Sequence, residues 1–355
     1  MHLMDILALR PVPAAAVLMA ITRRCPLRCR HCSTGSLPTS QEHPGHPFLR
    51  LAGTFTPGDR PELVMLTGGE PLLRPRLVRS LAETAAASGS RTMILSGMFF
   101  APRIPPAIGE AIEAADHFSA SLDAFHEEEV PRESVFAVMR TLLARGKDLS
   151  FHVTGAGPED PYLRDVTSAI RREFDDRVPV LVSRVQPVGR ARALPPNASP
   201  AVRDTAPQEE RETQARVLPC AMAAWPVVGF DGTITACCNQ DVVDHRPVPA
   251  HLLLGHARDD GWSTIRERCL GSDTLRAIRT YGPLRLADAP GSGYCETCRA
   301  LGPLTRARTP VSAFLERQVR DMQLAAGGAG FARRYGCPPY SELVSLGHPR
   351  RNDGL

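Results

Sequence analysis

The feature that most constrains the fold is a regular alternation of short apolar runs and amphipathic stretches in the first half of the chain. Strands separated by helices of this length favour parallel β/α units. The expected strands are Val17–Thr22, Leu63–Thr67, Arg91–Ser96, His117–Leu122, Leu149–Thr154 and Pro179–Val185, with helices around 75–88, 105–116, 131–145 and 161–175. Six such units predict an α/β fold, a partial (β/α)6 TIM-like barrel with its chemistry at the carboxyl ends of the strands.

The second half of the chain has a different pattern. Residues 191–219 are polar and rich in proline, which predicts a linker. In the stretch VVGFDGTITACC, Asp231 and Gly232 supply a tight turn between two short strands, so a β-hairpin is expected there. A helix is expected at 310–325. The resulting division is a partial barrel at 1–190, a linker at 191–219, a small domain at 220–300 and a C-terminal helical extension at 301–355.

Composition excludes several classes of function. The net charge is only +4 over 355 residues, Lys147 is the single lysine, and the arginines form no long basic block, so nucleic-acid binding is not expected. No apolar run approaches the roughly 20 residues that cross a membrane. The apolar stretch near the N-terminus lacks a charged start and continues directly into the first group of cysteines, so we interpret it as the first core strand and not as a signal peptide. A cytoplasmic protein is expected.

Seven of the ten cysteines fall in groups, which in a cytoplasmic protein indicates metal binding or catalysis. In the stretch CPLRCRHC, Cys25, Cys29 and Cys32 have the spacing C-x3-C-x2-C directly after the first expected strand. A structural zinc site uses four closed ligands. Three thiolates on one loop suit a [4Fe-4S] cluster with one iron open to a small molecule. The alternatives are redox cysteines, or a zinc ion completed by a distant residue.

With this loop the sequence resembles the radical S-adenosylmethionine (SAM) enzymes. The resemblance implies that Cys25, Cys29 and Cys32 bind the cluster and that the amino and carboxylate groups of SAM occupy the open iron. It also implies that an electron from the cluster cleaves SAM to a 5′-deoxyadenosyl radical, which removes a hydrogen atom from the substrate. A flavodoxin- or ferredoxin-type reductant is the expected source of the electron.

Three further segments extend the resemblance. TGGEP at 67–71 resembles the family's GGE element: Gly68 and Gly69 allow close backbone approach to SAM, and Glu70 accepts a hydrogen bond from its ammonium, with Pro71 next to it. SASLDAFHE at 119–127 resembles the SLDG segment and implies contacts from Ser121 and Asp123, although Ala124 replaces the usual glycine. Ser96, in ILSGM, completes the expected cofactor-binding set.

The later cysteines resemble the auxiliary-cluster domain of this family, in its short Twitch form or as a reduced SPASM domain. The resemblance implies a second [4Fe-4S] cluster, fully ligated by Cys220, Cys237, Cys295 and Cys298. Cys238 could replace its neighbour as a ligand, and a four-cysteine structural zinc site is the rival interpretation. The two remaining cysteines, Cys269 and Cys337, are candidates for returning a hydrogen atom to the substrate radical, or else small buried hydrophobes.

The resemblance does not identify the substrate. One hypothesis is a small secondary metabolite, such as a sugar, aminoglycoside or nucleoside, changed by dehydrogenation, epimerisation, decarboxylation or dehydration. The alternative is a ribosomally synthesised peptide, matured by crosslinking or epimerisation. Peptide maturases often carry a leader-binding domain before the barrel, and only about 16 residues precede the first expected strand, which favours the small molecule. A non-catalytic iron–sulfur electron carrier is a third, distant hypothesis.

Overall fold

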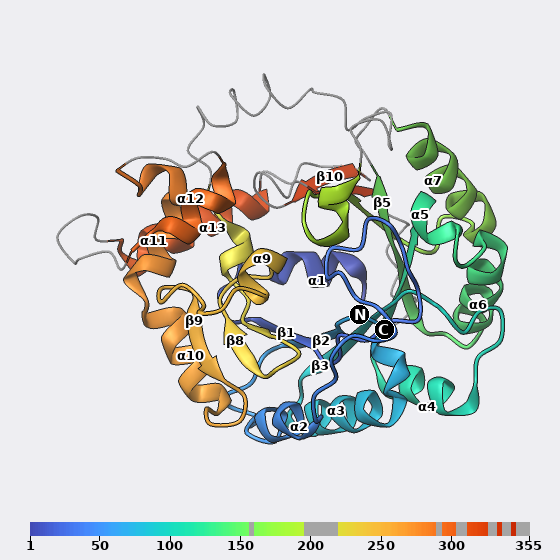
Figure 1. The fold of residues 1–355 in the computed structure, drawn as a ribbon, viewed down its shortest axis with the longest axis horizontal. Helices are drawn as coiled ribbons and strands as arrows, with labels where there is room; N and C mark the ends of the chain where they lie inside the picture. The colour runs from blue at the N-terminus through green and yellow to red at the C-terminus, as the bar shows by residue number, and fades with distance from the viewer. Residues whose placement is uncertain are drawn as a thin grey trace, which may run out of the picture.

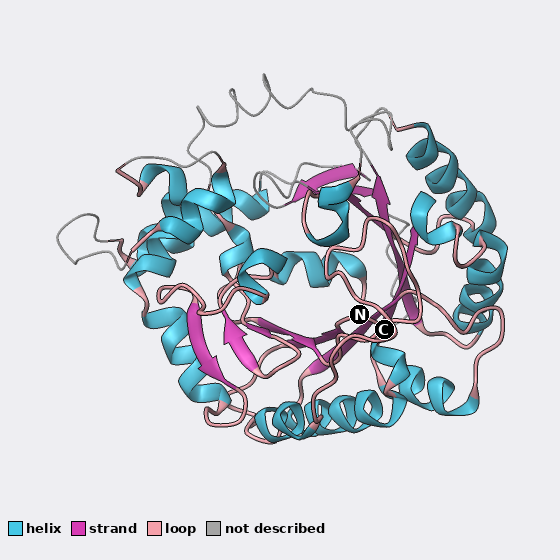
Figure 2. Ribbon diagram, in the orientation of Figure 1, coloured by secondary structure: helices cyan, strands magenta, loops and turns pink. Residues whose placement is uncertain are grey.

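The computed structural model describes residues 1–155, 160–194, 219–288, 293–302, 311–325, 332–335 and 342–345. Figure 1 shows a curved sheet with helices on its outer side and with α1 (Leu3–Leu9) inside the curve. Figure 2 separates the same helices and strands by colour. No helix within the described ranges combines the length and the apolar character that crossing a membrane requires.

One sheet runs through both halves of the chain, in the strand order β10-β11-β6-β5-β4-β3-β2-β1-β7-β8-β9. Strands β1 to β6 pair in parallel, as a chain of β/α units requires. The strands are β1 Ala16–Ala20, β2 Leu63–Thr67, β3 Arg91–Ser96, β4 His117–Asp123, β5 Asp148–Gly155, β6 Val180–Arg184, β7 Val227–Val228, β8 Thr233–Thr235, β9 Leu253–His256, β10 Ala332–Tyr335 and β11 Glu342–Ser345. The six predicted barrel strands are therefore confirmed, and β2 and β3 begin and end at the predicted residues.

The helices between these strands cover the convex face of the sheet (Figure 1). Helix α3 illustrates why: its apolar residues recur at helical spacing and are buried, and Gly89 ends it in the left-handed conformation. The α-helices are α1 Leu3–Leu9, α2 His46–Ala52, α3 Pro75–Ser88, α4 Pro106–Ala114, α5 Ala124–Glu127, α6 Arg132–Ala144, α7 Pro161–Phe174, α9 Gln240–Val243, α10 Trp262–Gly271, α11 Asp273–Tyr281, α12 Tyr294–Ala300 and α13 Ala313–Ala325.

Helix α1 corrects the expectation that the apolar N-terminal stretch is the first core strand, because residues 3–9 are helical and β1 begins only at Ala16. It begins with a capping box between His2 and Asp5 and lies inside the curve of the sheet (Figure 1). Its Ile6 packs in one cluster with the first residues of β1 and β2, Ala16 and Leu63. Helix α1 therefore fills the barrel interior at the N-terminal ends of the strands.

The second half of the chain continues the barrel sheet. Strand β7 pairs in parallel with β1, and β8 and β9 follow it as antiparallel strands. The predicted hairpin turn is confirmed: Gly229 and Thr233 close it with a 2.8 Å hydrogen bond, and Gly232 has a φ of 92°. Most of the expected linker, residues 195–218, lies outside the described residues.

Candidate cofactor site and second cysteine cavity

The three-cysteine loop leaves the carboxyl end of β1. Its backbone is closed on itself, with the Cys32 amide donating to the Cys29 carbonyl at 3.2 Å and the Cys25 amide donating to Leu37 at 3.3 Å. All three thiols are partly exposed. Burial raises the pKa of Cys25 and of Cys29 to about 12, and the nearby Cys32 raises both as well. Cys25 and Cys29 therefore keep their protons until a metal ion displaces them.

The TGGEP segment packs directly on the start of the cysteine loop. Gly69 donates to the Thr22 carbonyl at 2.7 Å and Glu70 donates to the Arg24 carbonyl at 2.8 Å. A Cβ added at Gly68 would lie 2.3 Å from the Thr22 oxygen, and one at Gly69 would lie 2.2 Å from the Arg24 oxygen. Both glycines are thus required for this close approach of two backbones.

Glu70 is fully buried and joins the ends of β2 and β3. Its carboxylate accepts from the amides of Leu72 and Gly97, at 2.9 and 2.8 Å, and from the Ser96 hydroxyl at 3.0 Å. Burial raises the pKa of Glu70 to about 7, against the lowering effect of these bonds. Ser96 and Glu70, both predicted to contact SAM, are therefore bound to each other. Pro71 is buried at the start of the short 3-10 helix Pro71–Leu73.

Asp123 connects the end of β4 to the cysteine loop. One oxygen caps α5 by accepting from the amides of Phe125 and His126, at 3.0 and 2.9 Å. The other lies 3.3 Å from Nε2 of His31, which stands between Cys29 and Cys32 in the sequence. Burial opposes ionisation of Asp123, but the His31 contact and the amide bonds outweigh it, so the pKa of Asp123 is lowered.

Helix α5 thus packs on the cysteine loop, a contact that the sequence analysis missed. The rings of His31 and Phe125 stack with centroids 5.1 Å apart, and Arg30 forms an ion pair with Glu128. His126 binds the Gly97 carbonyl through Nε2. No sequence signal links residues this far apart, because the partners meet only when β4 is placed near β1.

A row of polar side chains lines the concave face of β4, β5 and β6. Ser121 and Thr154 are half-buried, and His152 lies beside Ser121 in the strand register. His152 Nε2 is 2.7 Å from the Ser183 hydroxyl. Burial lowers the pKa of His152 to about 4, so the imidazole is neutral at pH 7. This surface, the polar wall, presents uncharged hydrogen-bonding groups. Ser121, a predicted SAM contact, belongs to it.

The four cysteines of the second set share one cavity. Cys220, Cys237, Cys295 and Cys298 all line a small hollow of about 20 Å³, with Tyr294, Asn239 and four apolar residues completing the lining. Burial raises the pKa of Cys237 and Cys298 well above the usual thiol value, and the thiol of Cys220 raises both further. Cys295 and Cys298 are close in sequence, but Cys220 and Cys237 are far from them and from each other, so the fold brings these three segments together.

The remaining cysteines lie elsewhere. Cys238 does not line the cavity, and its sulfur accepts from the Arg10 guanidinium at 3.3 Å. Cys269 is fully buried in the apolar core on α10, and its thiol points to the Ala224 carbonyl. Cys337 lies outside the described residues. The suggested hydrogen-donor roles of Cys269 and Cys337 stay predictions.

The residues at the cysteine loop fit the cluster and SAM that the sequence implies. Three thiols share one loop, and two imidazole nitrogens beside them, His31 Nδ1 and His126 Nδ1, are buried with no hydrogen-bond partner. Such buried polar atoms are costly unless a ligand satisfies them. Within the described ranges, no three His, Cys, Asp or Glu side chains are close enough to hold a single metal ion, whereas a [4Fe-4S] cluster places its thiolate ligands further apart.

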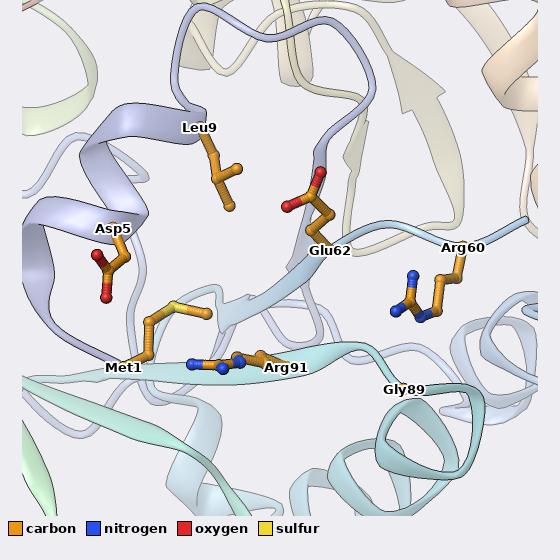
Figure 3. Close-up of a pocket in the computed structure, with 7 residues that line it drawn as sticks. All are labelled: Met1, Asp5, Leu9, Arg60, Glu62, Gly89 and Arg91. Carbon is orange, nitrogen blue, oxygen red and sulfur yellow. The ribbon is translucent and has the colours of Figure 1, made fainter. Parts of the chain in front are cut away.

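A larger pocket lies at the other end of the strands (Figure 3). Its volume is about 290 Å³, and its lining includes Asp5, Arg60, Glu62 and Arg91. Glu62 and Arg91 lie at the N-terminal ends of β2 and β3, whereas the cysteine loop follows the carboxyl end of β1. This pocket is therefore separate from the candidate cofactor site.

Comparison with known families identifies the barrel. Residues 19–168, from β1 into α7, match the model of the Radical SAM superfamily. These residues form a radical SAM domain. The match contains the cysteine loop, the TGGEP segment and Asp123. The chain is accordingly an enzyme that carries a radical SAM domain, and the family of this domain implies one [4Fe-4S] cluster and SAM. No curated protein matches the sequence.

Solved structures share the fold of the radical SAM domain and of the segments after it. Streptococcus suis SuiB bound to precursor peptide SuiA has a TM-score of 0.51 at 12% identity, covering 79% of this chain and 68% of that one. SuiB bound to S-adenosylmethionine has a TM-score of 0.48 at 13% identity, covering 67% of each chain. anSMEcpe with bound AdoMet has a TM-score of 0.49 at 11% identity, covering 80% of this chain and 94% of that one. At 12% identity the likeness to SuiB with its precursor peptide concerns the fold alone.

Proposed function

We propose that this radical SAM enzyme modifies a ribosomally synthesised peptide, using a second [4Fe-4S] cluster held by Cys220, Cys237, Cys295 and Cys298. The observation that carries the proposal is the four-cysteine cavity on a sheet continuous with the barrel. The fold likeness to SuiB, a protein solved with its precursor peptide, extends over 79% of the chain and so beyond the radical SAM domain. This favours the peptide hypothesis over the small metabolite.

In this proposal the cysteine loop holds the first cluster through Cys25, Cys29 and Cys32. When bound, the cluster and SAM together supply a carbon radical that removes one hydrogen atom from the substrate. The backbone at Gly68 and Gly69 forms the wall nearest the loop, because neither glycine leaves room for a side chain there. Glu70 holds the ends of β2 and β3 together by accepting hydrogen bonds from the amides of Leu72 and Gly97.

The polar wall is the proposed substrate surface. Ser121 and His152 offer hydroxyl and neutral imidazole groups that match the amide donors and acceptors of a peptide backbone. A neutral His152 neither repels a cationic side chain nor forms an ion pair with an anionic one, so the wall discriminates little by charge. Discrimination by charge would fall to residues outside the wall.

The second cavity has a zinc alternative. Four thiolates serve a structural zinc ion as well as a closed cluster, and both would join the hairpin to α12. Metal and sulfide analysis separates the two. Reconstituted protein is expected to hold about eight irons per chain, and the double variant Cys295→Ala/Cys298→Ala about four. Stoichiometric zinc with only four irons in the unaltered protein would replace the second cluster with a zinc site.

The test of function uses the anaerobically reconstituted protein with dithionite and SAM. We expect release of 5′-deoxyadenosine, complete loss of release in Cys29→Ala, and partial uncoupled release in Cys295→Ala. Full turnover by Cys29→Ala would contradict the proposed cluster ligands. Peptides encoded beside the gene are then added, and a mass change that requires SAM supports the peptide hypothesis.

The small metabolite is the second candidate, because hydroxyl-lined walls also suit sugars and nucleosides. It gains support if 5′-deoxyadenosine release is stimulated by such a compound and by none of the neighbouring peptides. The non-catalytic electron carrier would leave SAM intact even when the first cluster is filled.

A further inference from the structure

Arg190, which follows β6, reaches back to the cysteine loop. Its backbone amide donates to the Cys32 carbonyl at 3.0 Å, its Nε donates to the Cys29 carbonyl at 3.0 Å, and its Nη1 donates to the Ser36 carbonyl at 2.5 Å. One residue therefore binds three carbonyls of a segment more than 150 positions away. A planar guanidinium can satisfy several fixed acceptors in this way, whereas an ammonium cannot.

Gly189 allows this contact. It adopts a φ of 56°, and a Cβ there would lie 2.1 Å from the Ser33 oxygen and 2.5 Å from the Cys32 oxygen. The chain after β6 is thus pressed against the cysteine loop, and only glycine fits. Hydrogen bonds from both its backbone amide and its guanidinium therefore hold Arg190 against the loop.

The guanidinium lies against the cysteine loop, with its Nε 3.0 Å from the carbonyl oxygen of Cys29. Arg190 forms no ion pair with a carboxylate in the described part of the chain, since its side-chain hydrogen bonds go to carbonyl oxygens. Carbonyls leave its positive charge in place. Arg23, Arg30 and Arg74, by contrast, are paired with Asp244, Glu128 and Glu42.

We propose that Arg190 is a positioning residue for the iron–sulfur cluster: it fixes the Cys29–Cys32 segment in its ligating shape, and its uncompensated charge raises the reduction potential of the bound cluster. The inference rests on the proposed ligands Cys25, Cys29 and Cys32. Reduction adds one electron from dithionite and so one negative charge to the cluster. A fixed positive charge nearby favours that state.

Three variants separate the two effects. Arg190→Gln removes the charge and most of the carbonyl bonds, and Arg190→Lys keeps the charge but loses the planar fork. Arg192→Gln is the matched control, because Arg192 lies in the same 3-10 helix and forms a surface ion pair with Asp241. Iron per chain is counted after gel filtration. The midpoint potential is followed by dithionite titration, using the EPR signal that changes when SAM is added.

We expect Arg190→Gln to retain less iron than Arg192→Gln and to have a more negative midpoint potential. Arg190→Lys is expected to restore the potential but not the iron content. If Arg190→Gln holds no cluster, the potential of Arg190→Lys relative to Arg192→Gln decides the charge effect. Equal iron and potential in Arg190→Gln and Arg192→Gln would overturn the inference, as would equal shifts in the Gln and Lys variants. A control with no iron and no SAM-sensitive signal would instead contradict the proposed cluster ligands.

Discussion

At the scale of single residues, the candidate site depends on polar groups that satisfy one another. The Ser96 hydroxyl donates a hydrogen bond to buried Glu70, and Asp123 both caps α5 and contacts His31. The sequence pointed to Glu70, Ser96 and Asp123 through family motifs. It could not indicate His31, since a histidine between two cysteines has no distinctive pattern and its partner lies 92 positions away. Tertiary placement alone creates that contact.

The sequence left open whether Cys237 or Cys238 is a ligand of the second cluster, and the structure predicts Cys237. Cys237 lines the four-cysteine cavity, whereas the Cys238 sulfur binds Arg10. We expect Cys237→Ala to lose about four irons per chain after reconstitution and Cys238→Ala to keep them. Iron and sulfide analysis of the two variants checks this. The reverse pattern would make Cys238 the ligand.

Glu70 predicts a pH dependence of stability. Its pKa rises from 4.5 in the unfolded chain to about 7 in the fold, so the folded state binds more protons between these values. Stability should therefore fall as pH rises from 4.5 to 7, by about 3 kcal/mol for this group. In urea unfolding, the free energy of the unaltered protein should fall by this amount relative to that of Glu70→Gln over this pH range.

The buried histidines act in the opposite direction. The pKa values of His117 and His152 are lowered to about 4 by burial, so these residues make stability rise with pH up to about 6.5 in both proteins. The difference between the unaltered protein and Glu70→Gln isolates the carboxyl group. Glu62→Gln, an exposed glutamate ahead of β2, is the control and should leave the pH dependence unchanged. Parallel curves for Glu70→Gln and the unaltered protein would refute the raised pKa.

At the scale of elements, the parallel strands were predictable and the short helices were not. Strands such as β2 are apolar runs bounded by turn residues, and their burial on both faces leaves a clear sequence signal. Helix α5 has only four residues and no periodicity to detect. Helix α1 had a usable signal, since Asp5 stands three residues after the capping His2, but its apolar residues merged with those of β1.

The contact of α5 with the cysteine loop can be tested at Asp123. Asp123→Ala removes both the helix cap and the His31 contact, and should cost about 1–2 kcal/mol of unfolding free energy. Asp123→Asn keeps a cap and should cost less. Both should retain less iron than the unaltered protein, because the charge facing His31 is lost. Urea unfolding and iron content after gel filtration measure the two effects.

Asp160→Ala provides a control of the same kind. Asp160 caps α7 by accepting from the Tyr162 amide at 2.9 Å, on an element that does not contact the cysteine loop through any described hydrogen bond. It should lose similar stability yet hold iron normally. If Asp160→Ala and Asp123→Ala lose iron equally, the loss reflects general instability rather than the α5 contact.

At the scale of the whole molecule, the two halves share one sheet and one core. Trp225, from the second half, is 4% exposed and packs with Ile6 and Ala16, while its indole nitrogen donates to the Leu9 carbonyl at 2.9 Å. The sequence divided the chain at 191–219 from composition. Composition cannot report that β7 pairs with β1, because pairing between distant strands leaves no local pattern.

This shared core predicts a single cooperative unfolding transition. Trp225→Ala should cost about 3–5 kcal/mol, and the whole transition should move to lower urea. The only other tryptophan, Trp262, is buried on α10, so its fluorescence reports the second half while circular dichroism reports mainly the barrel. The two signals should coincide. Leu253→Ala, at a 46% exposed position, is the control. Separate transitions would show that the halves fold independently.

The position of α1 has a consequence for the order of events in the enzyme. Because this helix packs inside the N-terminal end of the barrel, we expect SAM and the substrate to enter from the cysteine-loop end. Ligands that enter through the same opening bind one after the other. We therefore expect the ligand that binds deepest to enter first and leave last, which product-inhibition kinetics would show as an ordered mechanism.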